Sequence, residues 1–283
     1  MTAPAVTVAE ALSRARAALG GDRPARLEAE VLLAHALGWP RARLHAWPGH
    51  RLGPAQHRAV SALLRRRRRG EPVAYLTGRR EFWSLDLRVT PDTLIPRPET
   101  ERLVELALER LPANGTPRVA DIGTGSGAIA LALASERPTA HISAVDVCPR
   151  ALAVAQDNAR RLGLGRVEFH CGELLAPLLD NSFDMVCANL PYVADGDPHL
   201  EQDGLPFEPR AALVAAKGGL ALIEALAAQA REVLPPGGWL VLEHGSKQGP
   251  AVTALLGQLG YGGIQCAHDH AHLPRVSLGQ WQA

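Results

Sequence analysis

From Arg118 to the end of the chain, short apolar runs alternate with longer segments of helical period. The predicted strands are 119–122, 141–147, 167–171, 183–189 and 239–244, the predicted helices are 128–136, 149–162, 219–233 and 250–259, and two strands follow the last helix. Strands and helices that alternate at this spacing form a mainly parallel sheet covered on both faces. The sequence therefore predicts an α/β fold in which ligands bind beyond the carboxyl ends of the strands.

The segment before this region is predicted to fold separately. Residues 1–77 have helical period, with a capping-box pattern at Thr7 and Glu10, and we expect three helices that form a small bundle for substrate recognition. In 82–89 apolar and polar residues alternate, which predicts a strand, with the turn of a hairpin at 78–80. We therefore expect a helical domain at 1–77, a β-hairpin linker at 78–95 and a catalytic domain at 96–283.

Composition narrows the class of protein. The chain of 283 residues is 47% hydrophobic and 21% charged, as in soluble globular proteins, and we expect neither a bilayer-spanning segment nor a secretory signal. Its net charge of +1 gives no strong field that would gather nucleic acid. The four cysteines lack the spacing of a zinc site or a disulfide scaffold, so we expect a cytoplasmic protein.

A glycine-rich segment lies between the first predicted strand and its helix. It reads Asp121-Ile-Gly-Thr-Gly-Ser-Gly127, with Gly123, Thr124, Gly125, Ser126 and Gly127 in the turn. Glycines let a backbone approach a nucleotide closely, and Asp146 at the end of the second strand can accept both ribose hydroxyls. A nicotinamide dinucleotide also fits this loose pattern. The alternate glycines and an Asp121 that could hold an ammonium group favour S-adenosylmethionine.

The tetrapeptide Asn189-Leu-Pro-Tyr192 follows the fourth strand of this region and indicates the reaction class. An amide or adenine nitrogen is a poor nucleophile, so two acceptors must take its N–H bonds and orient its lone pair. The Asn189 side-chain oxygen and the carbonyl of Leu190 are the predicted acceptors. Pro191 keeps residue 190 extended, and Tyr192 gives a flat wall for a planar group. Alignment and electrostatics then supply most of the rate of methyl transfer.

With these motifs the chain resembles the bacterial release-factor glutamine methyltransferases over nearly its whole length. The resemblance rests on segments 70–78, 81–85, 94–100, 121–127, 144–146, 207–209 and 242–245. It implies a helical N-terminal domain, a hairpin linker and a seven-stranded class I methyltransferase (Rossmann-like) domain. The implied reaction methylates the glutamine nitrogen in the Gly-Gly-Gln loop of class-I peptide release factors.

The resemblance also assigns roles to individual residues. It implies that Gly123–Gly127 and Asp146 hold S-adenosylmethionine, that Glu173 and Leu174 lie along its adenine, and that Asn189–Tyr192 hold the glutamine. The family pattern has proline where this chain has Leu190. Only the carbonyl of residue 190 is needed, so we expect a working site that turns over more slowly than one with proline.

Parts of the sequence are also compatible with two other functions. Asn-Leu-Pro-Tyr also resembles the ribosomal-RNA adenine dimethyltransferases, so the alternative substrate is an adenine of RNA or DNA. A near-neutral charge and an aromatic content of 4% argue against a nucleic-acid substrate. A nucleotide-binding partner protein without catalysis is disfavoured by the intact Asn189, Pro191 and Tyr192. We expect a monomer whose partner is a release factor, with no membrane contact.

Four further features have plainer interpretations. Arg65–Arg69 is expected to be a solvated helix end. Cys266, His268, His270 and His272 would share one face of a strand, which suggests zinc, but we expect no metal. Glu243-His244 is expected to shape the cofactor-side loop. Asp203 and Glu208 lie in a loop where a substrate-covering lid belongs.

Overall fold

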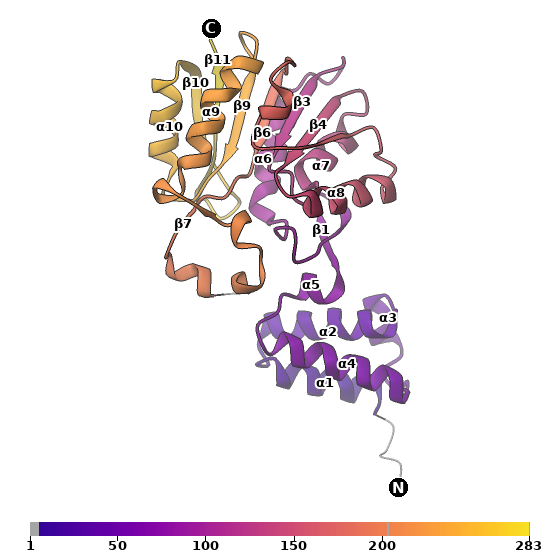
Figure 1. Ribbon diagram of the computed structural model, residues 1–283. Coiled ribbons are helices and arrows are strands. Elements are labelled where there is room, and N and C mark those ends of the chain that lie inside the picture. Colours follow the sequence, from indigo (N-terminus) through magenta and orange to yellow (C-terminus); the bar gives the residue numbers. More distant parts are fainter. Residues whose placement is uncertain (1–5, 203, 283) are drawn as a thin grey trace. The chain divides into compact units, whose positions relative to one another are not determined.

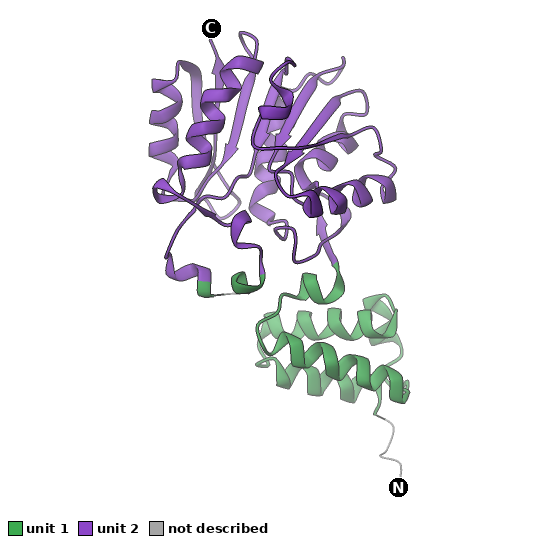
Figure 2. Ribbon diagram, in the orientation of Figure 1, with its two compact units in different colours: residues 1–78, 201–207 green, residues 79–200, 208–283 purple. Residues whose placement is uncertain are grey.

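The computed structural model describes residues 6–202 and 204–282. Asp203, expected in a lid, lies outside these residues. The chain divides into two compact units, shown in Figure 2. Unit 1 comprises 1–78 together with 201–207, and unit 2 comprises 79–200 together with 208–283.

Unit 1 is helical. Its helices are α1 (Val8–Ala18), α2 (Arg23–Leu37), α3 (Arg41–Ala46), α4 (Pro54–Arg67) and α5 (Val73–Thr77). The capping box at the start of α1 is confirmed, since Thr7 and Glu10 exchange hydrogen bonds of 2.9 and 3.3 Å. The expectation of three helices was wrong, because α3 and α5 are too short to show a periodic apolar stripe.

Unit 2 contains a seven-stranded sheet in the order β10-β11-β9-β6-β3-β4-β5. Its strands are β3 (Arg118–Ile122), β4 (His141–Asp146), β5 (Glu168–Cys171), β6 (Met185–Ala188), β9 (Trp239–Glu243), β10 (Tyr261–His268) and β11 (Pro274–Trp281). Neighbours from β5 to β9 pair in parallel, and β11 pairs antiparallel with both β9 and β10. The predicted seven-stranded α/β fold is confirmed.

Helices cover both faces of this sheet (Figure 1). They are α6 (Glu101–Arg110), α7 (Ala128–Glu136), α8 (Pro149–Arg161), α9 (Ala221–Val233) and α10 (Gly249–Gln258). One core cluster contains buried side chains of α6 and α7, and the other contains those of α9 and α10. Along β3, Val119 belongs to the first cluster and Ala120 to the second, as expected for a strand that is buried on both sides.

The hairpin exists, but its turn was misplaced. The strands are β1 (Arg79–Phe82) and β2 (Leu85–Arg88), and they turn at Trp83 and Ser84 instead of 78–80. Both turn residues have positive φ, of 51° and 57°. The alternating apolar residues that predicted a single strand lie on both sides of this turn and within it. The pattern is not interrupted because Trp83, which is part of the turn, also packs against the core.

The chain order explains where the site forms. β3 is central, β4 lies on one side of it and β6 on the other, so the connections after β3 and after β6 diverge at the carboxyl edge of the sheet. The expected long loop after β6 contains a small parallel sheet of β7 (Val193–Ala194) and β8 (Val214–Ala215). Over the described residues, no helix is long and apolar enough to cross a membrane.

Candidate active site

A cavity of about 340 Å³ opens at the carboxyl ends of β3, β4 and β6. Most of the predicted site residues line it: Gly123, Gly125, Asp146, Glu173, Leu174, Asn189, Leu190 and Pro191. Asp121, Thr124, Ser126, Gly127 and Tyr192 do not line it. A volume of roughly 300–1,000 Å³ is typical of small-molecule pockets. The structure therefore brings the glycine loop and the Asn189 motif to one cavity.

The glycine loop needs glycine at each alternate position. Gly123, Gly125 and Gly127 have φ of 75°, 56° and 86°, a region that other residues rarely adopt. A Cβ on Gly123 would also lie 2.9 Å from Leu190 Cδ2. Asn158 Nδ2 donates to the Ser126 carbonyl at 2.9 Å and fixes the far end of the loop.

Asp121 lies beneath the loop and is fully buried. Its Oδ2 accepts from Thr124 Oγ1 at 2.6 Å and from the Ala130 amide at 3.1 Å, while its Oδ1 has no partner within the described chain. Burial raises the pKa of Asp121 to about 6, although both hydrogen bonds lower it. In this structure Asp121 shapes the loop and the start of α7.

Asp146 joins the two loops on either side of the cavity. One carboxylate oxygen accepts from the Gly125 amide at 2.8 Å and the other from the Cys148 amide at 2.8 Å. A carboxylate oxygen has two lone pairs, so each still has one for a further donor. Asp146 can therefore accept from two neighbouring hydroxyl groups.

The apolar wall beyond β5 contains an unusual backbone. Leu174 is buried, lines the cavity and has φ of 48°. Gly172 before it has no room for a side chain, because a Cβ would lie 2.9 Å from the Pro177 ring. Glu173 is exposed at the cavity mouth. This wall suits a flat, apolar ring with polar edges.

Leu190 has a packing role that its sequence did not reveal. It is 5% exposed, belongs to the same core cluster as α9 and α10, and its Cδ2 faces Gly123. The leucine side chain thus fills the space between the glycine loop and the Asn189 motif.

Tyr192 is held by the loops around it. Gln248 Nε2 donates to the carbonyls of Tyr192 and Gly218, both at 3.0 Å, and its Oε1 accepts from the Gly245 amide at 2.8 Å. A Cβ on Gly219 would lie 1.9 Å from the Tyr192 carbonyl oxygen, so only glycine fits there. The Tyr192 hydroxyl lies 3.3 Å from Glu243 Oε1, and burial raises the pKa of Tyr192, which keeps this hydroxyl protonated.

Two further segments line the cavity, and only Leu94 and Pro209 of them belong to motifs noted in the sequence. They are residues 91–94 and the residues Pro209, Ala211 and Ala212. Buried Glu208 joins them, since its carboxylate accepts from the Ile95 amide at 3.0 Å and pairs with Arg97. Both segments adjoin motifs noted in the sequence, but only the fold places Glu208 next to Arg97.

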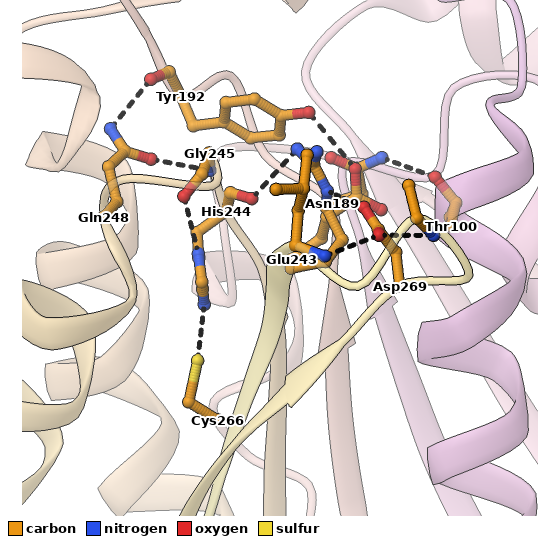
Figure 3. Close-up of polar contacts among 12 residues, drawn as sticks. Thr100, Asn189, Tyr192, Glu243, His244, Gly245, Gln248, Cys266 and Asp269 are labelled. Carbon is orange, nitrogen blue, oxygen red and sulfur yellow. Dashed lines mark hydrogen bonds and ion pairs between the residues drawn. The ribbon is translucent and has the colours of Figure 1, made fainter.

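The sequence suggested that Glu243 shapes the cofactor-side loop, and in the structure its carboxylate contacts Tyr192 of the Asn189 motif. It ends β9, is 1% exposed and lies beneath the Asn189 motif, with Tyr192 and Thr100 as neighbours (Figure 3). Its neighbour His244 is fully buried and bonded to Ser277 Oγ at 2.8 Å and the Gly245 carbonyl at 2.9 Å. Thr100 and Glu243 are therefore the main polar residues near the site whose positions sequence patterns did not predict.

The expected shared face of Cys266, His268, His270 and His272 was wrong. β10 ends at His268 with an irregular register, and His270 lies in the following turn, 3.5 Å from Glu105. Among the residues that the structure describes, no group of three or more potential metal ligands occurs.

The arginine run at the end of α4 is partly paired. Arg67 makes two hydrogen bonds to Glu28, of 2.7 and 2.9 Å, and Arg66 bonds to Glu71 at 2.7 Å. These ion pairs lie within unit 1 and connect α4 to α2 and to the segment after α4.

Comparisons with known proteins agree with this architecture. The family described as "PrmC N-terminal domain" matches residues 10–78, and the one described as "Methyltransferase domain" matches 114–260. The release factor glutamine methyltransferase of Vibrio cholerae is 47% identical over 98% of each chain. That of Escherichia coli is 46% identical over 95% of this chain and 97% of its own. The chain belongs to the release factor glutamine methyltransferase family. It is thus an enzyme with a methyltransferase domain.

Solved structures support the fold of this family member. A methyltransferase from Pyrococcus furiosus matches with a TM-score of 0.54 and 19% identity, over 70% of this chain and 90% of that one. A 16S rRNA N2 G1207 methyltransferase of Thermus thermophilus also has a TM-score of 0.54, at 19% identity over 72% of this chain and 50% of its own. At such identities the likeness concerns the fold alone.

Proposed function

We propose that this enzyme transfers the methyl group of S-adenosylmethionine to the side-chain amide nitrogen of the glutamine in the Gly-Gly-Gln motif of class-I peptide release factors. The observation that supports this most is the shared cavity. Asp146 and the glycine loop form one part of its wall, and Asn189, Leu190 and Pro191 form another. A nucleotide and an amide group could therefore meet there.

The residues of the cavity fit the proposed cofactor. Asp146 has free lone pairs for two ribose hydroxyls, and Leu174 offers an apolar wall for adenine, with Glu173 at its edge. The absence of side chains at Gly123 and Gly125 leaves room for close approach. Asp121 would act through the shape of the loop, because it does not line the cavity. Bound there, S-adenosylmethionine would supply a methyl group on a positively charged sulfur.

The Asn189 motif fits a primary amide. Asn189 Nδ2 donates to Thr100 Oγ1 at 3.1 Å, which leaves the Asn189 side-chain oxygen as an acceptor on the other side of the amide. This oxygen and the Leu190 carbonyl would take the two N–H bonds of the glutamine, while Tyr192 supports the loop that carries them. Holding the amide in this orientation aligns the nitrogen lone pair for attack.

The identity of the substrate rests on the relatives, which are named release factor glutamine methyltransferases. We propose that unit 1 contributes to recognition of the release factor, and that the enzyme acts as a monomer. Because release factors work with ribosomes, we place the reaction in the cytoplasm.

The test is to incubate the enzyme with S-adenosylmethionine and a purified class-I release factor, followed by peptide mass spectrometry. We expect one added methyl group on the Gly-Gly-Gln glutamine. Asn189→Ala should lower the rate about 100–1,000-fold, the usual loss when one preorganised polar partner is removed. Asn114→Ala, at an exposed position in the loop after α6, is the matched control and should retain the wild-type rate.

Two results would contradict the proposal. One is transfer to RNA or DNA with none to the release factor, which would make the adenine reading of Asn-Leu-Pro-Tyr correct. The other is full activity of Asn189→Ala, which would place the amide site elsewhere.

A further inference from the structure

A line of polar side chains runs beneath Asn189 on three different elements. Glu243 ends β9, Asn189 follows β6, and Thr100 precedes α6. β6 and β9 are paired neighbours, with Ala188 opposite Leu242, so Asn189 and Glu243 lie side by side at the edge of the sheet. Thr100 and Glu243 are 3% and 1% exposed, so water does not compete for their hydrogen bonds.

Two hydrogen bonds join these side chains to the Asn189–Tyr192 motif (Figure 3). Asn189 Nδ2 donates to Thr100 Oγ1 at 3.1 Å, and the Tyr192 hydroxyl donates to Glu243 Oε1 at 3.3 Å. The Thr100 hydroxyl lowers the pKa of the neighbouring Glu243 carboxyl, whose Oε2 is buried and has no hydrogen-bond partner among the described residues. Glu243 therefore bonds to Tyr192 at one end of the Asn189–Tyr192 motif, and its Oε2 is free to accept from Thr100, which bonds to Asn189 at the other end.

The direction of these hydrogen bonds is set by the carboxylate. An ionised carboxylate only accepts, so when Glu243 is ionised, a Thr100 hydroxyl that faces Oε2 gives its single hydrogen to Glu243. The Thr100 oxygen can then only accept, and it takes an N–H of Asn189. If the Asn189 amide turned over by 180°, its oxygen would face the lone pairs of Thr100, and its NH₂ group would face the substrate.

We propose that Thr100 and Glu243 are positioning residues that fix the Asn189 amide with its oxygen toward the substrate, and thereby select a substrate group with N–H donors. This inference rests on the proposed function, and it adds a reason for choosing glutamine over glutamate. A glutamate carboxylate has the same shape as the glutamine amide but no N–H to donate, and two facing acceptors repel each other. A site built to bond a donor discriminates strongly against an analogue that lacks it.

The experiment compares two substitutions at one position. Thr100→Val keeps the shape of threonine without its hydroxyl, and Thr100→Ser keeps the hydroxyl. Removal of a partner that orients a ligating group typically lowers activity about 10–100-fold, so we expect that loss of kcat in Thr100→Val. Thr100→Ser should recover most of it. Thr253→Val, whose hydroxyl bonds only to the Pro250 carbonyl on the exposed side of α10, controls for the change in side-chain chemistry.

Two further measurements separate orientation from a general structural effect. The Kd for S-adenosylmethionine should be the same in Thr100→Val and the wild type, because Thr100 does not line the cavity. A release factor with Gly-Gly-Glu should compete poorly with the normal substrate for the wild type and better for Thr100→Val. In Glu243→Gln the new side-chain amide can donate to the Thr100 hydroxyl, which would reverse the direction of the hydrogen bonds from Thr100 to Asn189. We expect a loss of kcat as large as that of Thr100→Val.

The outcomes distinguish this inference from the proposed function. Equal kcat in Thr100→Val and Thr100→Ser, or full activity of Glu243→Gln, would overturn the inference even if the wild type methylates the release factor. If the wild type does not, the proposed function fails, and the side-chain NH₂ signals of Asn189 in NMR spectra decide the inference instead. The inference is supported if the Asn189 NH₂ signals have a chemical shift typical of a hydrogen bond in Thr100→Ser and lose it in Thr100→Val. Equal chemical shifts in the two variants refute the inference.

Discussion

At the scale of single residues, the surroundings of Glu243 shift the pKa of its carboxyl group in opposite directions. Burial raises its pKa, and Glu99 raises it further, while Thr100, Arg275 and Tyr192 lower it. The result is a pKa of about 7, well above the ordinary 4.5. Arg275 is itself engaged by Asp269 at 3.2 Å, so it only partly compensates the charge of Glu243. The carboxyl group therefore changes charge within the physiological range of pH.

This pKa leads to a prediction about pH. If the ionised form of Glu243 orients Asn189, single-turnover rates at saturating substrate should rise about tenfold from pH 6 to pH 8, with a midpoint near 7. Glu243→Gln should lose this step. A wild-type profile that stays flat between pH 6 and pH 8 would contradict the assignment.

Ionisation of Glu243 is expected to lower the stability of the fold while it raises the rate of methyl transfer. The opposite signs allow the two effects to be measured separately. Between pH 4.5 and about 7 the folded protein holds a proton on Glu243 that the unfolded chain has released. The contribution of Glu243 to the free energy of unfolding therefore falls as pH rises through this window. Thermal unfolding of the wild type and Glu243→Gln over this range measures the difference.

Leu190 combines two roles at one residue. Its carbonyl is a proposed acceptor, and its side chain fills space over Gly123 that a proline would fill less completely. The sequence indicated only the loss of the fixed φ of proline. The packing of the side chain depends on the neighbouring glycine loop, which is far away in the sequence.

At the scale of elements, the β1–β2 hairpin turns through two residues that are not glycine or asparagine. Two-residue hairpin turns with both φ positive normally use those residues. Here tertiary contacts hold the turn, because the Trp83 amide donates to Glu101 Oε1 at 2.9 Å and the Trp83 indole donates to Glu136 Oε1 at 2.8 Å. The local sequence preference is thus overridden by α6 and α7.

The turn yields a prediction about stability. Ser84 has φ of 57°, a conformation that costs a residue with a Cβ roughly 1–2 kcal/mol. Ser84→Gly should therefore be more stable than Ser84→Ala by about 1 kcal/mol, measured by urea unfolding. Equal stability of the two variants would mean that the backbone at Ser84 is not strained.

α6 was absent from the sequence prediction although it is strongly amphipathic. Its buried residues are Leu103, Val104, Leu106 and Ala107. The three prolines at 91, 96 and 98 are typical of a domain junction, and they obscure the helical period of the segment that follows. Its start matters for function, because Thr100 immediately precedes it.

At the scale of the whole molecule, the loop after Tyr192 contributes to both units. The chain belongs to unit 2 up to Leu200, adds 201–207 to unit 1 and returns to unit 2 at Glu208. Within unit 1, a Cβ on Gly204 would lie 2.9 Å from Pro72 Cγ and 3.2 Å from the Gly70 carbonyl oxygen. Gly204 therefore marks a close approach between this segment and the end of the helical bundle.

Two alanine substitutions in this loop test the importance of that approach. Gly204→Ala and Gly196→Ala share the backbone strain of positive φ, 82° and 79°, but Gly196 has no neighbouring atom within 4 Å. We expect faster hydrogen exchange in 204–207 and a severalfold higher KM for the release factor only in Gly204→Ala. Similar behaviour of both variants would mean that the packing of this segment has no part in substrate binding.

The sequence by itself determined the order of the main strands and helices from β3 onward, the glycine loop, Asp146 and the Asn189 motif. These features are local: a period of two or 3.6, a turn that needs positive φ, or four consecutive residues at the end of a strand. The tertiary structure alone decided the turn at Trp83, the packing of Leu190, the bond between Glu208 and Arg97, and the bonds of Asn189 to Thr100 and of Tyr192 to Glu243. Each of these joins residues from separate elements, and the pairing of β6 with β9 brings such residues together only once the sheet has formed.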